Sequence, residues 1–493
     1  MMHWRAEPLP SPTPTRSRRL TPPGGAVGSR SQVARPRLVR FLGLAVAALL
    51  TANGVVVAEQ ASGRDLITLG GDGVSNAREA IARLLEDNKS SGQPPQVAGA
   101  VLEQSTTTTT AAPETTTTTA APAPVVNPEP STTSSAPPAT TTPTTAKKAA
   151  GGTDWVHVAE TIRPYIEKET GLPFTGAVKV AVLDGAAFNG RLDAARLNPA
   201  MDRARRAEAT LKALGVIEPT INLADQVKRL STGSVSTFYD VKANELVVKN
   251  GPLTPFVLKS IVHELARADY DQHFELDRPN LVAPDDETGV AFDSLVEGTA
   301  KRIETRFVSA LPDADKKSVQ TEEQRIAGQL PKDLPDYVLV QYAFPFGAGP
   351  KFADALMTAG GPAKVNAAFQ APPTTTEQII HPEKFLAGEG SKALADPAAD
   401  GQVIRSGSLG QLVLTMMLAQ VLDSGDAESA ADGWGADRYV AWQSGGQTCV
   451  RLSIQMDTPD KVTEMGGALT DWAKDTPGAT VQGSGPFIVT RCA

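Results

Sequence analysis

The sequence HELARADYDQHF, residues 263–274, does more than any other stretch to decide the fold of this chain. It follows the apolar run VLKSIV, and Pro255 stands where the first turn of a helix would lie. The pattern predicts a helix over about 254–271. Residues four positions apart share one face of a helix, so His263 and Arg267 should project from the same side.

The pentapeptide HELAR is one residue away from the zinc-binding motif H-E-x-x-H. In that motif two histidines bind zinc from one helical face, and the glutamate between them removes a proton from the zinc-bound water. A third ligand comes from a following helix and is often a glutamate. Glu297, in SLVEGTAKRIE, lies on a second predicted helix, 289–309, and is the candidate for that role. The acidic run 285–287 before it is interpreted as a solvated helix start.

Two motifs, in this order, resemble a known family. HELARADYDQHF and the later LVEGTA are similar to HELTHALQDQHF and LVEGDA, which occur in bacterial exported zincin-like metallopeptidases of the gluzincin type. Other similar stretches are the FYD and LVVK hairpin, PPTTTEQIIHPEKFL, and GWGADRYVAW followed by TCVRL. The resemblance covers 153–493 and implies an extracytoplasmic metallopeptidase fold. His263 and Glu297 would be metal ligands, and Glu264 would be the catalytic base of an active member.

Arg267 departs from that family at the decisive position, where the second histidine is needed. An arginine stays protonated at ordinary pH and has no lone pair for a metal. At an effective dielectric constant near 20 and a separation of about 5 Å, its charge would repel a divalent ion by roughly 6–7 kcal/mol. His263 and Glu297 would then form a remnant, unoccupied site, one short of the usual three protein ligands. We therefore expect no cofactor, unless another residue restores a zinc site.

Two residues are considered as replacements for the missing zinc ligand. His273 lies ten residues after His263, which is about 15 Å along a straight helix and too far to share a metal. Asp293 lies one turn before Glu297 and is the other candidate. The alternative hypothesis needs no metal: the Arg267 guanidinium has replaced zinc as the cation between the two glutamates of the motifs.

An uncharged apolar segment near the N-terminus predicts export. Residues 41–58 read FLGLAVAALLTANGVVVA and follow a basic, Pro- and Ser-rich segment, 1–40, which is expected to be disordered. Their length approaches the minimum for a transmembrane helix, and the arginines before them should stay in the cytoplasm. We expect a single-pass anchor in the cell membrane, with the C-terminal domain outside the cytoplasm. The alternative is a cleaved signal peptide and a secreted protein.

The rest of the chain divides by composition. Residues 59–104 allow one short linker helix, and 105–150 are almost entirely Thr, Ala, Pro and Ser, which predicts a disordered stalk. Residues 151–493 have the composition of a globular domain. Their two cysteines, Cys449 and Cys492, should form a disulfide in an exported chain, the alternative being two free thiols. The net charge is −8 and the chain has no basic stripe interleaved with aromatic residues, so nucleic acid is not an expected partner.

The predicted fold class is α+β: a mainly helical zincin-like domain with small antiparallel sheets, behind a transmembrane helix and a disordered stalk. One hairpin is expected at 236–249 and another near the C-terminus. We predict a membrane-tethered, extracytoplasmic domain that is catalytically inactive and binds a peptide or protein at the cell envelope. Two alternatives stay open: an active zinc metallopeptidase with an unusual ligand set, and a purely structural envelope protein.

Overall fold

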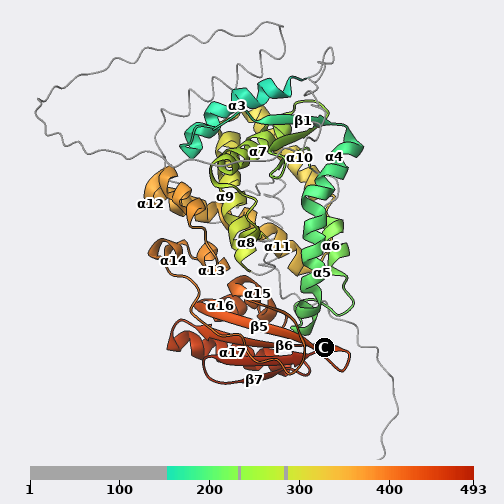
Figure 1. Cartoon of the computed structure of the whole chain (residues 1–493), viewed down its shortest axis with the longest axis vertical. Helices are drawn as coiled ribbons and strands as arrows, with labels where there is room; N and C mark the ends of the chain where they lie inside the picture. The colour runs from blue at the N-terminus through green and yellow to red at the C-terminus, as the bar shows by residue number, and fades with distance from the viewer. Residues whose placement is uncertain (1–152, 231–234, 283–286) are drawn as a thin grey trace, which may run out of the picture.

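The computed structural model describes residues 153–230, 235–282 and 287–493 (Figure 1). Two large hydrophobic cores organise these residues. The first core lies between long helices and a three-stranded sheet, in the upper part of Figure 1. The second lies against a five-stranded sheet formed by the C-terminal part of the chain, at the bottom of the same view.

The three-stranded sheet has the order β1-β3-β2. Its strands are β1 (Lys179–Leu183), β2 (Thr237–Asp240) and β3 (Glu245–Lys249). β2 and β3 form the predicted hairpin and are antiparallel, whereas β1 runs parallel to β3. Parallel strands need a long crossover connection. Helices of this connection are α4 (Gly185–Leu192), the π-helix η1 (Asp193–Leu197), α5 (Asn198–Ala213) and α6 (Leu223–Leu230).

Two long helices, α7 (Pro255–Phe274) and α9 (Glu287–Ala310), pack against each other in the first core. α7 begins where the sequence predicts, because the Thr254 side chain accepts a hydrogen bond from the Val257 N–H at 3.2 Å and caps the helix. Around them lie α3 (Trp155–Thr170), α8 (Pro279–Val282), α10 (Asp313–Ala327), α11 (Asp336–Gly347), α12 (Gly349–Gln370), α13 (Thr376–Ile380) and α14 (Pro382–Ala387).

α9 and α12 cross at two glycines, where their backbones come into direct contact. A Cβ atom added to Gly298 would lie 2.5 Å from the Cα of Gly349, and one added to Gly349 would lie 2.8 Å from the Cα of Gly298. No side chain fits at such distances, so both positions require glycine. Because Gly298 directly follows Glu297, this close crossing also fixes where Glu297 lies relative to the core.

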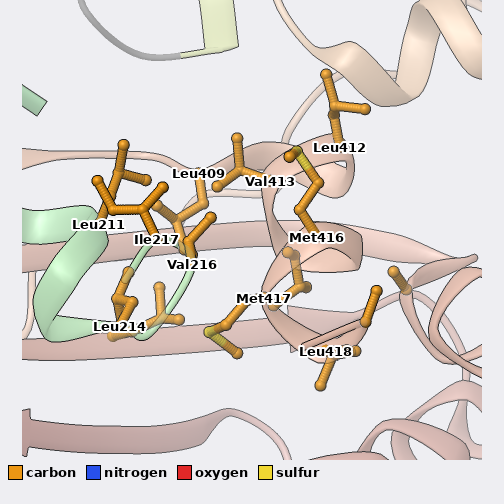
Figure 2. Close-up of a cluster of buried hydrophobic side chains, with 14 of the residues drawn as sticks. Leu211, Leu214, Val216, Ile217, Leu409, Leu412, Val413, Met416, Met417 and Leu418 are labelled. Atoms are coloured by element: carbon orange, nitrogen blue, oxygen red, sulfur yellow. The ribbon is translucent and has the colours of Figure 1, made fainter. Parts of the chain in front are cut away.

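The five-stranded sheet is antiparallel and has the order β4-β5-β6-β8-β7. Its strands are β4 (Val403–Gly407), β5 (Trp434–Ser444), β6 (Gln447–Met456), β7 (Thr480–Gln482) and β8 (Phe487–Cys492). Its helices are α15 (Gly410–Leu418), α16 (Ser424–Ala431) and α17 (Pro459–Lys474). Figure 2 shows apolar side chains of α15 beside those from the end of α5 and the loop after it. Through this contact α5 joins the second core to the first part of the chain.

The predicted disulfide is confirmed. Cys449 on β6 and Cys492 on β8 are directly paired residues of the antiparallel ladder, and their sulfur atoms are bonded. The bridge therefore joins two neighbouring strands of the C-terminal sheet.

The predicted fold class needs correction in two respects. Its α+β character agrees with the structure, but the small sheets are not all antiparallel, because β1 pairs in parallel with β3 across a helical crossover. The transmembrane helix of the prediction is not borne out either: across the described ranges, no helix is both long enough and apolar enough to cross a membrane. The segments on which the N-terminal predictions rest, 1–40, 41–58, 59–104 and 105–150, lie outside the described residues.

Candidate functional site

Four side chains that the sequence singles out meet between the two long helices. His263, Glu264 and Arg267 lie on α7, and Glu297 lies on α9. Their side chains are largely shielded from water, with exposed fractions between 7% for Glu264 and 17% for Glu297. In such an environment, charges interact more strongly than they do at the surface.

Arg267 lies between the two glutamates. Its Nη1 atom is 3.2 Å from Glu297 Oε1 and 3.5 Å from Glu264 Oε2. Burial would raise the pKa of Glu297, but the positive charges of Arg267 and His263 outweigh burial and lower that pKa to about 2. Glu297 is therefore ionised at any ordinary pH, and the guanidinium is one of its positive partners.

His263 lies between two carboxylates. Its Nε2 atom is 3.0 Å from Glu297 Oε2, and its Nδ1 atom is 3.1 Å from Glu304 Oε2. Burial alone would lower the pKa of His263, but its hydrogen bonds to the two glutamates raise it from 6.5 to about 9. At neutral pH both ring nitrogens then carry protons, and neither offers a lone pair to a metal.

A buried network of charges continues behind His263. Glu304 Oε1 accepts hydrogen bonds from Lys259 Nζ at 2.9 Å and from Lys301 Nζ at 2.8 Å. Lys259 also contacts Glu323 at 2.9 Å. Burial raises the pKa of Glu304, but the two ammonium groups and His263 lower it well below its ordinary value. The network thus balances each buried positive charge with a nearby carboxylate.

Glu264, which has the position of the catalytic base in the motif, is held by three groups. Arg196 Nη2 donates to its two oxygens at 3.0 and 3.2 Å, and the main-chain N–H of Tyr239 donates to Oε2 at 2.9 Å. Arg267 is the third, at the longer distance already given. A general base must direct an oxygen at the proton that it removes. Both oxygens of Glu264 already accept hydrogen bonds and tie α7 to η1 and β2.

The residues present do not fit a zinc ion. A zinc site uses at least three protein ligands, and each must be unprotonated. His263 and Glu297 are hydrogen-bonded to each other. Among the residues that the structure describes, no third metal-ligating side chain completes a zinc site with them. His273 Nε2 hydrogen-bonds the carbonyl oxygen of Pro173 at 2.8 Å instead. Asp293 interacts electrostatically with Glu297 and Arg267, but within the described ranges it does not belong to a group of three ligand atoms close enough to share a metal.

Another acidic cluster within the described ranges has a spacing that would suit a cation. Single oxygens of Glu377, Glu389 and Asp457 all lie within 4.8 Å of one another. The Lys384 ammonium group lies among them, 2.6 Å from Glu377 and 3.1 Å from Glu389. This cluster is a salt-bridge network centred on a lysine.

Several residues of the site were missed by the sequence analysis: Arg196, Lys259, Lys301 and Glu304. For two of them the spacing in the sequence gives a signal. Glu304 lies seven residues after Glu297, which is two turns along the same face of α9, and Lys259 lies one turn before His263. Arg196 carries none, because its contact joins residues far apart in the sequence through an irregular helical segment.

Comparisons with known proteins add one match. A family model described as a domain of unknown function, DUF8575, matches residues 400–491. That range covers the five-stranded sheet with its helices and includes neither α7 nor α9. No curated protein and no solved structure matches the chain significantly.

Proposed function

We propose that this protein is a catalytically inactive relative of the exported gluzincin-type metallopeptidases and acts by binding a peptide or protein. One observation carries the proposal: the Arg267 guanidinium contacts both Glu264 and Glu297, at the position where the related motif needs its second zinc-binding histidine. Hydrolysis by that motif depends on a metal-bound water. With His263 also protonated at neutral pH, two cations balance these carboxylates in place of a metal.

An aromatic side chain beside the site supports a binding role. Tyr342, on α11, is 36% exposed, and the charges of Arg196 and Glu297 act on its hydroxyl group. Phe346, one turn later on α11, lies with its ring 6.3 Å from that of His263. Tyr and Arg are enriched among the residues that contribute most to binding at protein interfaces. A peptide that lies across α11 and η1 would contact Tyr342 and Arg196 together.

A second candidate, a structural envelope protein, is supported by the burial of strand β2. An open edge strand can bind a peptide by accepting it as a further strand. Here Thr237, Phe238 and Tyr239 are all buried, and the N–H of Tyr239 is bonded to Glu264. Peptide binding at this edge is therefore not expected. A test of peptide binding at the surface around Tyr342 distinguishes the binding function from the structural one.

The disulfide favours a location outside the cytoplasm. Disulfides persist in oxidising compartments and are rare in the cytosol. The bond between Cys449 and Cys492 closes a long segment of chain, with 43 residues of sequence separation. We therefore place the proposed binding function on the outer side of the cell envelope.

The wild-type protein should contain no stoichiometric zinc, whereas Arg267→His should gain it. The substitution removes the guanidinium and adds an imidazole one helical turn from His263, which with Glu297 makes the three protein ligands that zinc needs. Zinc must displace the proton of His263, so the affinity of the variant should be higher at about pH 8 than at about pH 6. Elemental analysis after dialysis against zinc measures the difference.

Arg267→Gln is the matched control for this experiment. It removes the charge without adding a nitrogen ligand, and it should bind no zinc. One zinc per wild-type chain would contradict the proposal and support the active peptidase with an unusual ligand set. If Arg267→His stays free of zinc, the site has diverged from the related family at more than one position.

Tyr342→Ala should weaken peptide binding, whereas Ile380→Ala should not. Ile380 is 37% exposed, close to the exposure of Tyr342, but lies on α13 and not on α11 or η1. Peptides selected from a random library on the wild-type protein should lose about tenfold or more in affinity on the Tyr342 variant, measured by fluorescence polarisation. Equal losses in both variants, or no selectable peptide, would favour the structural candidate.

A further inference from the structure

Two arginines of the η1–α5 segment have N–H donors that no described residue uses. Arg196 donates to Glu264 through Nη2 only, and its side chain is 36% exposed. Arg203, seven residues later, is half-buried and makes neither a hydrogen bond nor an ion pair with any residue that the structure describes. Acidic residues outnumber Lys and Arg in this chain, 55 to 47, so these free donors do not result from a shortage of carboxylates.

Both guanidinium groups face the same side of α9. Burial raises the pKa of Asp293 to about 6, and the charge of Arg203 opposes this shift. The charge of Arg196 acts on Glu297 and helps to lower the pKa of that glutamate. Asp293 and Glu297 lie one turn apart on α9, so the η1–α5 segment runs antiparallel to α9 along this side. Arg203 and Asp293 nevertheless form no ion pair, which means that a space separates the two helices here.

Two side chains show that this space is a groove that water enters. Asp293 is exposed, yet enough protein surrounds it to raise its pKa. Tyr342, on α11, is 36% exposed, and burial likewise raises the pKa of its hydroxyl group. The charges of Arg196 and Glu297 both act on that hydroxyl group, so Tyr342 lies between the two walls of the groove. In Figure 1, α11 is seen between α9 and α5.

The wall formed by η1 and α5 carries positive charge that the protein does not neutralise. Glu297, on the opposite wall, already pairs with Arg267 and His263. A neutral ligand would cover Arg203 without pairing its charge, which is unfavourable, and a cationic ligand would be repelled by both arginines. A carboxylate can accept two parallel N–H bonds from a guanidinium group. The groove therefore favours a ligand that brings carboxylates.

The opposite wall favours a peptide as the carrier of these carboxylates. Asp293 makes no hydrogen bond with any described residue, and its oxygens can accept main-chain N–H groups of a peptide. Seven residues of helix place Arg196 and Arg203 about 10 Å apart along the axis. Three residues of extended chain span about the same distance. Two acidic residues about three positions apart would therefore reach both arginines.

We propose that the groove between α5 and α9 binds an acidic segment of a partner protein, as an extended peptide whose carboxylates pair with Arg196 and Arg203. The segment passes over Tyr342 between these two contacts. This inference rests on the proposed peptide-binding function and adds the chemical class of the ligand.

Selection of peptides from a random library on the purified full-length protein is the first test. The selected peptides should be enriched in Asp and Glu. Arg203→Glu should weaken the binding of a selected peptide about tenfold or more in fluorescence polarisation, because it replaces a charge-assisted contact by repulsion. Arg203 has no partner among the described residues, so the variant should unfold at the same denaturant concentration as the wild-type protein. Wild-type affinity in Arg203→Glu would overturn the proposal.

Arg205→Glu is the matched control, with the same change of charge on the same helix. Residues two positions apart on a helix do not share a face, and Arg205 is exposed and pairs with Asp202 at 2.5 Å. At physiological salt, where charges beyond about 8 Å are largely screened, its affinity for the peptide should stay within about twofold of the wild-type value. Equal losses in Arg203→Glu and Arg205→Glu would overturn the pairing with Arg203.

An exchange of charges tests the contact directly. A peptide in which Lys replaces the acidic residues should bind the wild-type protein poorly and Arg203→Glu more tightly. Arg203→Lys keeps the positive charge and should retain most of the affinity for the acidic peptide. Tighter binding of the Lys peptide to the wild-type protein than to Arg203→Glu would contradict the proposal.

Failure of this inference can be distinguished from failure of the proposed function. Selected peptides that lose affinity on Tyr342→Ala, but are not enriched in acidic residues and bind Arg203→Glu like the wild-type protein, would overturn the acidic ligand and leave the binding function in place. If no peptide can be selected, the binding function fails and the acidic ligand fails with it.

Discussion

Arg267→Ala should lower the free energy of unfolding by about 3–5 kcal/mol, because it removes one partner of a buried ion pair. The Arg267 side chain is 11% exposed and lies 3.2 Å from Glu297 Oε1. After the substitution Glu264 keeps its ion pair with Arg196 at 3.0 Å, whereas Glu297 keeps its contact with His263 and a weaker electrostatic interaction with Arg196. Denaturant unfolding followed by tryptophan fluorescence measures the loss.

Arg325→Ala is the matched control for the Arg267 substitution. Arg325 pairs with Glu322 at 2.6 Å on the exposed face of α10, and exposed pairs of this kind contribute about 1 kcal/mol or less. A double variant with Glu297→Ala adds a second check. If Arg267 and Glu297 stabilise each other, the free energy of unfolding should fall less in the double variant than the sum of the decreases in the two single variants. An unfolding midpoint of Arg267→Ala at the same denaturant concentration as that of the wild-type protein would contradict a stabilising ion pair.

The loss of stability in Arg267→Ala should also depend on pH in a defined direction. Glu297 has a pKa of about 2 in the folded protein and about 4.5 when unfolded, so its contribution is fully present above pH 4.5 and is lost as pH falls toward 2. Without Arg267, the pKa of folded Glu297 rises and this contribution shrinks. The difference between wild type and variant should therefore be largest near neutral pH and become smaller below about pH 4.5.

Local patterns were sufficient to predict the elements that carry this site. The Thr-Pro start of α7, the helical spacing of HELAR and the LVEG motif of α9 each depend on residues within a few turns of one another. The hairpin of β2 and β3 and the disulfide of the C-terminal sheet were predictable for the same reason: a tight turn and a lone pair of cysteines leave few alternatives.

The missed features depend on contacts between distant segments. β1 has no signal of its own for pairing in parallel with β3, because the pairing is set by how the intervening helices pack. Glu287 follows acidic neighbours and begins a helix, which is typical of a solvated position. Its burial comes from Thr376 and Ser408, which lie far along the chain and approach it only when the two cores meet.

Glu304→Gln should be as destabilising as the loss of Arg267, by about 3–5 kcal/mol, although it hardly changes the volume of the side chain. Glu304 accepts hydrogen bonds from Lys259 and Lys301 and contacts His263 at 3.1 Å, so three buried cations lose one shared anion. Lys259 retains Glu323 as a partner. Glu322→Gln, on the exposed face of α10, is the control and should lose about 1 kcal/mol or less.

The effect of Glu304→Gln should change with pH in the opposite sense to that of Arg267→Ala. The pKa of His263 is raised from 6.5 to about 9 in the folded protein, so its contribution is present below pH 6.5 and is lost as pH rises through 9. Glu304→Gln removes one of the two carboxylates that contact His263, so it lowers the pKa of His263 and reduces the contribution of His263 to stability. The gap between wild type and variant should therefore be wider at about pH 6 than at about pH 9.

A combined variant distinguishes a positioning role of Glu304 from a purely stabilising one. A carboxylate on the second nitrogen of a zinc-binding histidine orients the ring and raises its basicity, and its loss typically weakens metal binding about tenfold to a hundredfold. In the Arg267→His background, Glu304→Gln should therefore weaken zinc binding by about that factor, measured where both proteins are folded. Equal zinc affinity with and without Glu304→Gln would limit Glu304 to balancing the buried lysines. A weaker affinity would mean that Glu304 still orients His263 for metal binding, although in the wild-type protein Arg267 supplies the positive charge at this site.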